Sequence, residues 1–161
     1  MTRARGNGAL PQDTRAAVYI EYLIAILPVV TFFIATWGLI EMLAADLVLR
    51  RAASAAARAA VVVLPDDPHF YDGAPENVVG GKRKEDIDLA AAMILEASGH
   101  FRDYHVDIEG ERKESAPLTA TVRAQYYCGA GWTSIVCGGT SRWLTEKATY
   151  AYQGAPFKYE L

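Results

Sequence analysis

The most prominent pattern in the chain is an uninterrupted apolar run near its N-terminus. Between Tyr22 and Ile40 no side chain is charged, and Leu, Ile, Val, Phe and Ala dominate. A helix of about 20 such residues crosses a hydrocarbon core of roughly 30 Å, so the run predicts a transmembrane segment over about 22–40. A buried core helix of a soluble protein is the alternative, but such a helix is rarely apolar on all sides over this length. A cleaved secretory signal has a shorter apolar region of about 7–15 residues.

The helical pattern continues past the apolar run, which predicts one long helix over 17–64. Such a helix is about 70 Å long, so roughly half of it projects beyond a membrane. Pro28 predicts a kink inside the span. In the projecting half, a polar stripe recurs every four residues and includes an acid–base pair at i,i+4: Asp46, Arg50, Ser54 and Arg58. A second face is mostly small and is predicted to pack closely on another element: Ala45, Val48, Ala52, Ala55, Ala59 and Val62.

Residues 65–161 predict one α+β domain. Residues 65–83 are rich in Pro, Gly and Asp and indicate an irregular loop. A short amphipathic helix follows, with one apolar face: Ile87, Ala90, Ala91, Ile94 and Leu95. We expect Gly99 to end this helix. We expect three acidic residues to lie at its N-terminal end, where the helix dipole favours negative charge: Glu85, Asp86 and Asp88.

The distal part of the chain predicts β-structure. Strands are expected at 104–110, 118–128 and 144–153. In the second strand the even positions form the less polar face: Leu118, Ala120, Val122, Ala124 and Tyr126. Sequential strands with turn-like connections favour an antiparallel sheet with one face covered. We expect the small-residue face of the long helix to cover it.

Charge and motif content narrow the function classes. The net charge of −3 with mixed signs provides no basic surface for nucleic acid. We find no Ser-His-Asp or Cys-His arrangement, phosphate-binding Gly loop or metal-spaced Cys/His set, so we expect neither an enzyme nor a cofactor. One acidic loop is a weak calcium candidate without regular ligand spacing: Asp66, Asp67, His69 and Asp72. Asp- and Pro-rich turns are common for conformational reasons, so we expect no metal.

Two cysteines lie nine positions apart around a Gly-rich loop. Cys128 and Cys137 are expected to form a disulfide if this part of the chain faces an oxidising compartment. The alternative is a pair of buried free thiols.

The segment AAVYIEYLIAILP, from Ala16 to Pro28, resembles the processing site of class III (type IVb) prepilins of the tight-adherence (Tad/Flp) system. Those sites have a short basic leader, a small residue, four further residues and then Glu, commonly followed by Tyr or Phe. The resemblance implies that 1–16 is a leader, cut by a prepilin peptidase between Ala16 and Ala17. Glu21 and Tyr22 then follow as the fifth and sixth mature residues. Ala16 departs from the usual Gly before the cut.

A second segment, RRAASAAARAA from Arg50 to Ala60, resembles the Ala- and Arg-rich helix of TadE-like minor pilins, or pseudopilins. The resemblance implies a type IV pilin-like fold in the bacterial inner membrane, with the N-terminus cytoplasmic and 65–161 extracytoplasmic. The partners it implies are a prepilin peptidase, other pilin-like subunits, pilus assembly machinery and membrane lipid. The length of the chain favours a minor subunit that acts in assembly of an adhesive Tad pilus, and whether it enters the fibre stays open. The alternative is an uncleaved signal-anchored protein whose small extracytoplasmic domain binds a ligand or cell-wall component.

The resemblance also gives Glu21 a role in assembly. Cleavage creates a free α-amine at Ala17 near the membrane boundary. Glu21 of the same or a neighbouring subunit can pair with this amine in a poorly hydrated setting. The alternative is that Glu21 is a helix-end acid that reaches the lipid headgroups.

Overall fold

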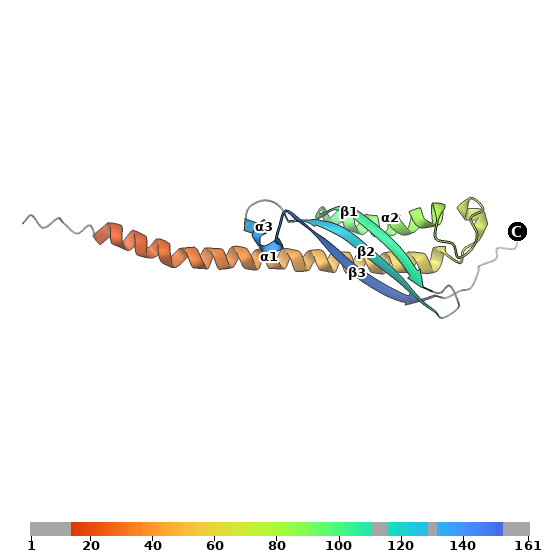
Figure 1. The fold of residues 1–161 in the computed structure, drawn as a ribbon, viewed down its shortest axis with the longest axis horizontal. Helices are drawn as coiled ribbons and strands as arrows, with labels where there is room; N and C mark the ends of the chain where they lie inside the picture. Colours follow the sequence, from red (N-terminus) through yellow and green to blue (C-terminus); the bar gives the residue numbers. More distant parts are fainter. Residues whose placement is uncertain (1–13, 111–115, 129–131, 153–161) are drawn as a thin grey trace, which may run out of the picture.

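The computed structural model describes residues 14–110, 116–128 and 132–152. Figure 1 shows one long helix with a small α+β domain gathered along its second half. The elements in chain order are α1 (Thr14–Val63), a 3₁₀ helix η1 (Pro68–Tyr71), α2 (Gly81–Ser98), β1 (Phe101–Gly110), β2 (Pro117–Tyr127), α3 (Trp132–Cys137) and β3 (Ser141–Ala151). Most of the expected leader lies outside the described residues.

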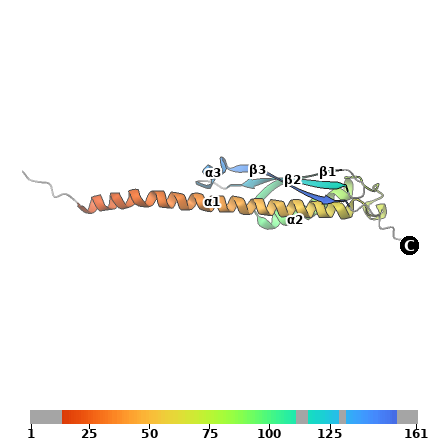
Figure 2. The same ribbon diagram turned by 90° about the horizontal axis from the view of Figure 1, so that it is seen from below.

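Helix α1 confirms the prediction of a single long helix. Its 50 residues correspond to about 75 Å. The helix continues through Pro28, and Figure 1 shows a bend in its first, red-orange part. The N-terminal half stands free of the domain, whereas the C-terminal half is the scaffold on which the domain is built (Figures 1 and 2).

The sheet is antiparallel, as the sequence pattern predicted, and its strand order is β1-β2-β3. Val122 lies at its centre, opposite Val106 on β1 and Glu146 on β3. All five even positions of β2 are buried, which confirms the predicted inward face: Leu118, Ala120, Val122, Ala124 and Tyr126.

The predicted contact face of α1 was only partly right. Ala45 and Ala52 are buried, but Val62 is 67% exposed. Along the half that carries the domain, the buried set is wider, is shifted around the helix and extends to Leu64 directly after α1: Ala45, Leu49, Ala52, Ala53, Ala56, Ala57, Ala60 and Leu64. The cause is that α1 is covered from two sides, by the sheet and by α2 (Figure 2). Six of the eight are alanines, which let both neighbours approach the helix backbone closely.

Helix α2 differs from the prediction at its start. It begins at Gly81, so its first turn carries no acidic residue, and Glu85, Asp86 and Asp88 lie further along the helix. The C-terminal prediction is confirmed, because Gly99 adopts a left-handed conformation with φ of +68° and caps the helix. The expected apolar face is also present: Ile87, Ala91 and Leu95 are buried, and Ala90 and Ile94 are half-buried.

Candidate membrane anchor and assembly surface

The first half of α1 exposes a large apolar surface. Within Val18–Val63 lies a stretch with a mean hydropathy of 2.4, long and apolar enough to cross a membrane. Its large side chains are exposed, among them Leu27, Phe32 and Phe33. An apolar surface of this extent on one element is characteristic of contact with lipid or with other apolar helices.

Two acidic residues bracket the charge-free run. Glu21 and Glu41 lie twenty positions apart, which corresponds to about 30 Å of helix, close to the thickness of a hydrocarbon core. The indole nitrogen of Trp37 donates a hydrogen bond to the Glu41 carboxylate at 2.8 Å. Trp is enriched at membrane–water interfaces, so this pair is suited to the membrane boundary at the Glu41 end of the apolar run. Sequence reasoning overlooked the pair, although the i,i+4 spacing of Trp37 and Glu41 is a usable signal.

The residues of the expected processing and assembly site lie at the free end of α1. Ala16 and Ala17 belong to its helical first turn, but their side chains lie outside the described part. Glu21 and Tyr22 are both exposed, and Tyr22 is 60% exposed. Among the described residues, no ion pair includes Glu21. The isolated fold therefore leaves its carboxylate accessible to another molecule.

The two cysteines lie together at the end of the domain nearest the free half of α1. Cys128 follows β2 and Cys137 ends α3, and the chain joins them at disulfide distance with Cα atoms 6.2 Å apart. Buried Cys128 packs with Tyr126 against Ala45, about one helical turn beyond Glu41. The Cys128 amide also donates to the carbonyl oxygen of Thr140 at 3.0 Å. This pairing fixes α3, which lies in a segment expected to be a Gly-rich loop, against α1.

The acidic loop uses its carboxylates to shape the backbone. Asp66 accepts hydrogen bonds from the Asp67 amide at 2.9 Å and from the Tyr71 hydroxyl at 3.2 Å. Asp67 caps η1 by accepting from the His69 amide at 2.9 Å. Asp72 caps the other end of η1 in a left-handed conformation. Over the described residues, no group of three or more His, Cys, Asp or Glu is placed to hold a metal ion.

Arg83 is a buried cation at the far end of the domain, and sequence reasoning did not identify it. Its side chain is fully buried, and its guanidinium donates to the carbonyl oxygens of Val63, Leu64, Asp66 and Ala74.

The Arg83 guanidinium also lies 4.1 Å from the centre of the Tyr71 ring, a cation–π arrangement. Burial raises the pKa of the Tyr71 hydroxyl, and the hydrogen bond to Asp66 raises it further. These contacts connect the end of α1, the acidic loop and the start of α2.

The polar stripe on α1 forms the predicted intrahelical pair and also reaches β3. Arg50 pairs with Asp46 at 3.2 Å and with Glu146 of β3 at 3.5 Å. Ser54 shares a hydrogen bond of 2.9 Å with the Tyr150 hydroxyl, to which Arg58 donates at 3.0 Å. The bonds from Ser54 and then Arg58 lower the pKa of Tyr150. The stripe therefore connects the helix to the sheet.

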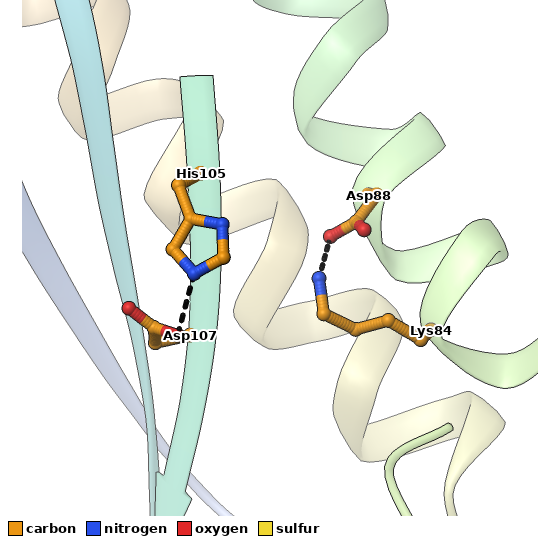
Figure 3. Close-up of polar contacts among 4 residues, drawn as sticks. All are labelled: Lys84, Asp88, His105 and Asp107. Atoms are coloured by element: carbon orange, nitrogen blue, oxygen red, sulfur yellow. Dashed lines mark hydrogen bonds and ion pairs between the residues drawn. The ribbon is translucent and has the colours of Figure 1, made fainter. Parts of the chain in front are cut away.

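Two further polar pairs lie on α2 and β1. Figure 3 shows Lys84 paired with Asp88 on α2, and His105 of β1 lying 3.0 Å from Asp107 on the same strand. All four side chains are partly or largely solvent-exposed, and each pair stays within its own element. Exposed pairs of this kind contribute little stability.

No family model, no curated protein and no solved structure matches this chain.

Proposed function

We propose that this chain is a TadE-like minor pilin, or pseudopilin, that acts in assembly of a Tad pilus used for adhesion. One observation carries the proposal. A single helix, α1, is divided into a free apolar half and a half packed under a three-stranded antiparallel sheet. The segment ending in Glu21 and Tyr22, at the free end of this helix, resembles a prepilin processing site.

The proposed subunit is held in the bacterial inner membrane by the apolar half of α1, with residues 65–161 outside the cytoplasm. A prepilin peptidase removes residues 1–16 and leaves Ala17 as the new N-terminus. The exposed apolar surface of α1 then packs against helices of other pilin-like subunits, since apolar helices associate in lipid through close packing. The Glu21 carboxylate pairs with the Ala17 amine of a neighbouring subunit.

The test is the mass of the mature chain. The full chain is expressed with a prepilin peptidase and, in parallel, with an inactive peptidase. The proposal predicts that only the active enzyme removes 16 residues, a loss of about 1.7 kDa, and leaves Ala17 first. Ala16→Phe is the control, because a bulky residue before the cut should block processing while leaving the span intact.

An intact Met1 in the presence of the active peptidase would contradict the proposal. It would favour the uncleaved signal-anchored protein, whose domain binds a ligand or cell-wall component.

A further inference from the structure

The cysteine-linked end of the domain lies at the level where the apolar run of α1 ends. Helix α3 packs against α1, and both views show it at the end of the sheet facing the free half of the helix. Gly38 is the one buried residue among the described positions 18–44, and Ile34 and Ala35 are half-buried. These residues precede Glu41 and belong to the charge-free run. The domain therefore covers one side of the helix within the last turns of the apolar segment.

Apolar side chains are exposed at this end. Ile135 of α3 is 69% exposed, although the cysteine pair holds its helix in place. Trp143, near the start of β3, is 56% exposed, and Tyr127, at the end of β2, is 42% exposed. In water such exposure has no benefit, whereas the boundary between lipid headgroups and acyl chains favours these side chains.

A polar hollow of about 190 Å³ lies beside these residues, at the same end of the sheet. All of its lining side chains can donate hydrogen bonds, and none is a carboxylate: Arg102, Gln125, Tyr127, Thr140 and Ser141. The Arg102 guanidinium lies 4.3 Å from the centre of the Tyr127 ring. Among the described residues it forms no ion pair, so its charge is available to an anion. A planar cation with several neighbouring hydroxyl donors matches a phosphate group.

We propose that α3 and the Arg102 hollow together dock onto the lipid headgroup layer, with Ile135 among the acyl chains and Arg102 on a lipid phosphate. The geometry allows this contact. Ala45, on which Cys128 packs, lies about 6 Å beyond Glu41 along the helix, and each headgroup layer is about 5–8 Å deep. The inference rests on the membrane anchor of the proposed function, but not on pilus assembly.

The test uses light-activated crosslinking of the full chain in phospholipid vesicles. Benzoylphenylalanine replaces one residue at a time, at Ile135, at Leu27 or at Val62, and lipid adducts are identified by mass spectrometry. Leu27 lies within the span and Val62 lies about 31 Å beyond Glu41, and both are nearly as exposed as Ile135, at 61% and 67%. The proposal predicts lipid adducts at Leu27 and Ile135 and none above background at Val62.

The other outcomes are distinguishable. Adducts at Leu27 without adducts at Ile135 would overturn the docking inference and leave the anchor standing. Absence of adducts at Leu27 would overturn the anchor itself. Crosslinking of Ile135 to a second copy of the chain would show that this surface contacts protein and would overturn lipid docking.

The phosphate contact is tested separately. Arg102→Glu should cause loss of lipid adduct at Ile135, since a carboxylate repels phosphate. Lys147→Glu makes the same charge change further along the exposed face of the sheet and should leave the adduct unchanged. If Arg102→Glu and Lys147→Glu give equal yields of the lipid adduct at Ile135, Arg102 does not bind a lipid phosphate.

Discussion

The Arg83 guanidinium donates a hydrogen bond to the carbonyl oxygen of Val63, the last residue of α1. The last four carbonyl groups of any helix have no partner within the helix. Here one buried side chain satisfies the last carbonyl of α1 and also binds the segment that follows, at Leu64, Asp66 and Ala74. Arg83 makes these bonds from the first turn of α2, where the helix dipole otherwise favours acidic residues.

Replacing Arg83 should therefore destabilise the domain strongly. Arg83→Met removes the side-chain donor from the partly buried carbonyl groups of Val63, Asp66 and Ala74, and we expect the free energy of unfolding to fall by about 3 kcal/mol or more. Arg83→Lys keeps the charge but lacks the planar fork, so it should recover only part of the loss. Urea unfolding of the full chain in detergent micelles, monitored by near-ultraviolet circular dichroism, measures the free energy of unfolding of both variants.

Lys84→Met is the matched control for Arg83→Met. It removes the neighbouring cation, which pairs with Asp88 of the same helix (Figure 3). Both side chains are partly exposed, so the change should lower the free energy of unfolding by no more than about 0.5 kcal/mol. Similar losses for Arg83→Met and Lys84→Met would contradict the proposed importance of the buried contacts.

The alanines of α1 give a second prediction. Ala56 is fully buried where α1 is covered by the sheet and by α2, whereas Ala44 on the same helix is exposed. Ala56→Leu should force its neighbours apart and cost about 1–3 kcal/mol, and Ala44→Leu should be close to neutral. The same urea titration compares them, and a tolerated Ala56→Leu would show that the packing is looser than the burial indicates.

Periodicity was sufficient to predict the elements that follow one simple pattern. The alternation in β2 identified the buried Val122, and the positive-φ requirement at a helix end identified Gly99. The contact face of α1 was harder to predict because two neighbours cover it, which widens the buried arc beyond one stripe. Arg83 was missed because its partners are backbone carbonyls up to 20 residues earlier in the chain, and these leave no pattern of side chains in the sequence.

Tyr150 should make the stability of the chain depend on pH. Hydrogen bonds from Ser54 and then Arg58 lower its pKa, so the folded chain releases this proton at a lower pH than the unfolded chain. The wild type should therefore gain stability relative to Tyr150→Phe as the pH rises through the lowered pKa. The gain should be complete above the tyrosine pKa of the unfolded chain, which is about 10. It should be lost as the pH falls through the lowered pKa of the folded chain. Unfolding at pH 8 and at several higher pH values measures this difference.

Tyr71 provides a control of opposite sign. Burial and Asp66 raise its pKa, so its contribution is present below the ordinary tyrosine value and is lost as the pH rises through the raised one. The wild type should therefore lose stability relative to Tyr71→Phe over the same titration. Parallel pH trends for Tyr150→Phe and Tyr71→Phe would contradict the assigned contacts.

The cysteine pair should stabilise the end of the domain beside the anchor. Closing a loop of about ten residues contributes on the order of 2–3 kcal/mol, so the Cys128→Ala, Cys137→Ala double variant should unfold at correspondingly lower urea. In envelope-derived protein, both thiols should resist labelling until a reductant is added. Labelling of both cysteines without a reductant would show that they are not paired and would weaken the assignment of this domain to an oxidising compartment.

The last prediction concerns Glu21, which is exposed at the free end of α1. If Glu21 pairs with the Ala17 amine of a neighbouring subunit, Glu21→Gln should insert and fold normally. Loss of a charge near the membrane edge favours insertion by at most about 2–3 kcal/mol, and by less near the boundary. Assembly should nevertheless fall, because the amine is left without a counter-charge in a poorly hydrated site.

Glu21→Gln is the sharper variant because it keeps the shape and hydrogen-bonding capacity of the side chain and removes only its charge. Glu21→Ala, which removes all three, should impair assembly at least as much. Each variant is scored for processing by mass spectrometry and for assembly by co-purification with pilus components and adhesion of a complemented deletion strain. Scoring both separates a processing defect from an assembly defect. If both variants are processed and restore adhesion as well as the wild type, Glu21 is a helix-end acid that reaches the headgroups, and the pairing hypothesis is wrong.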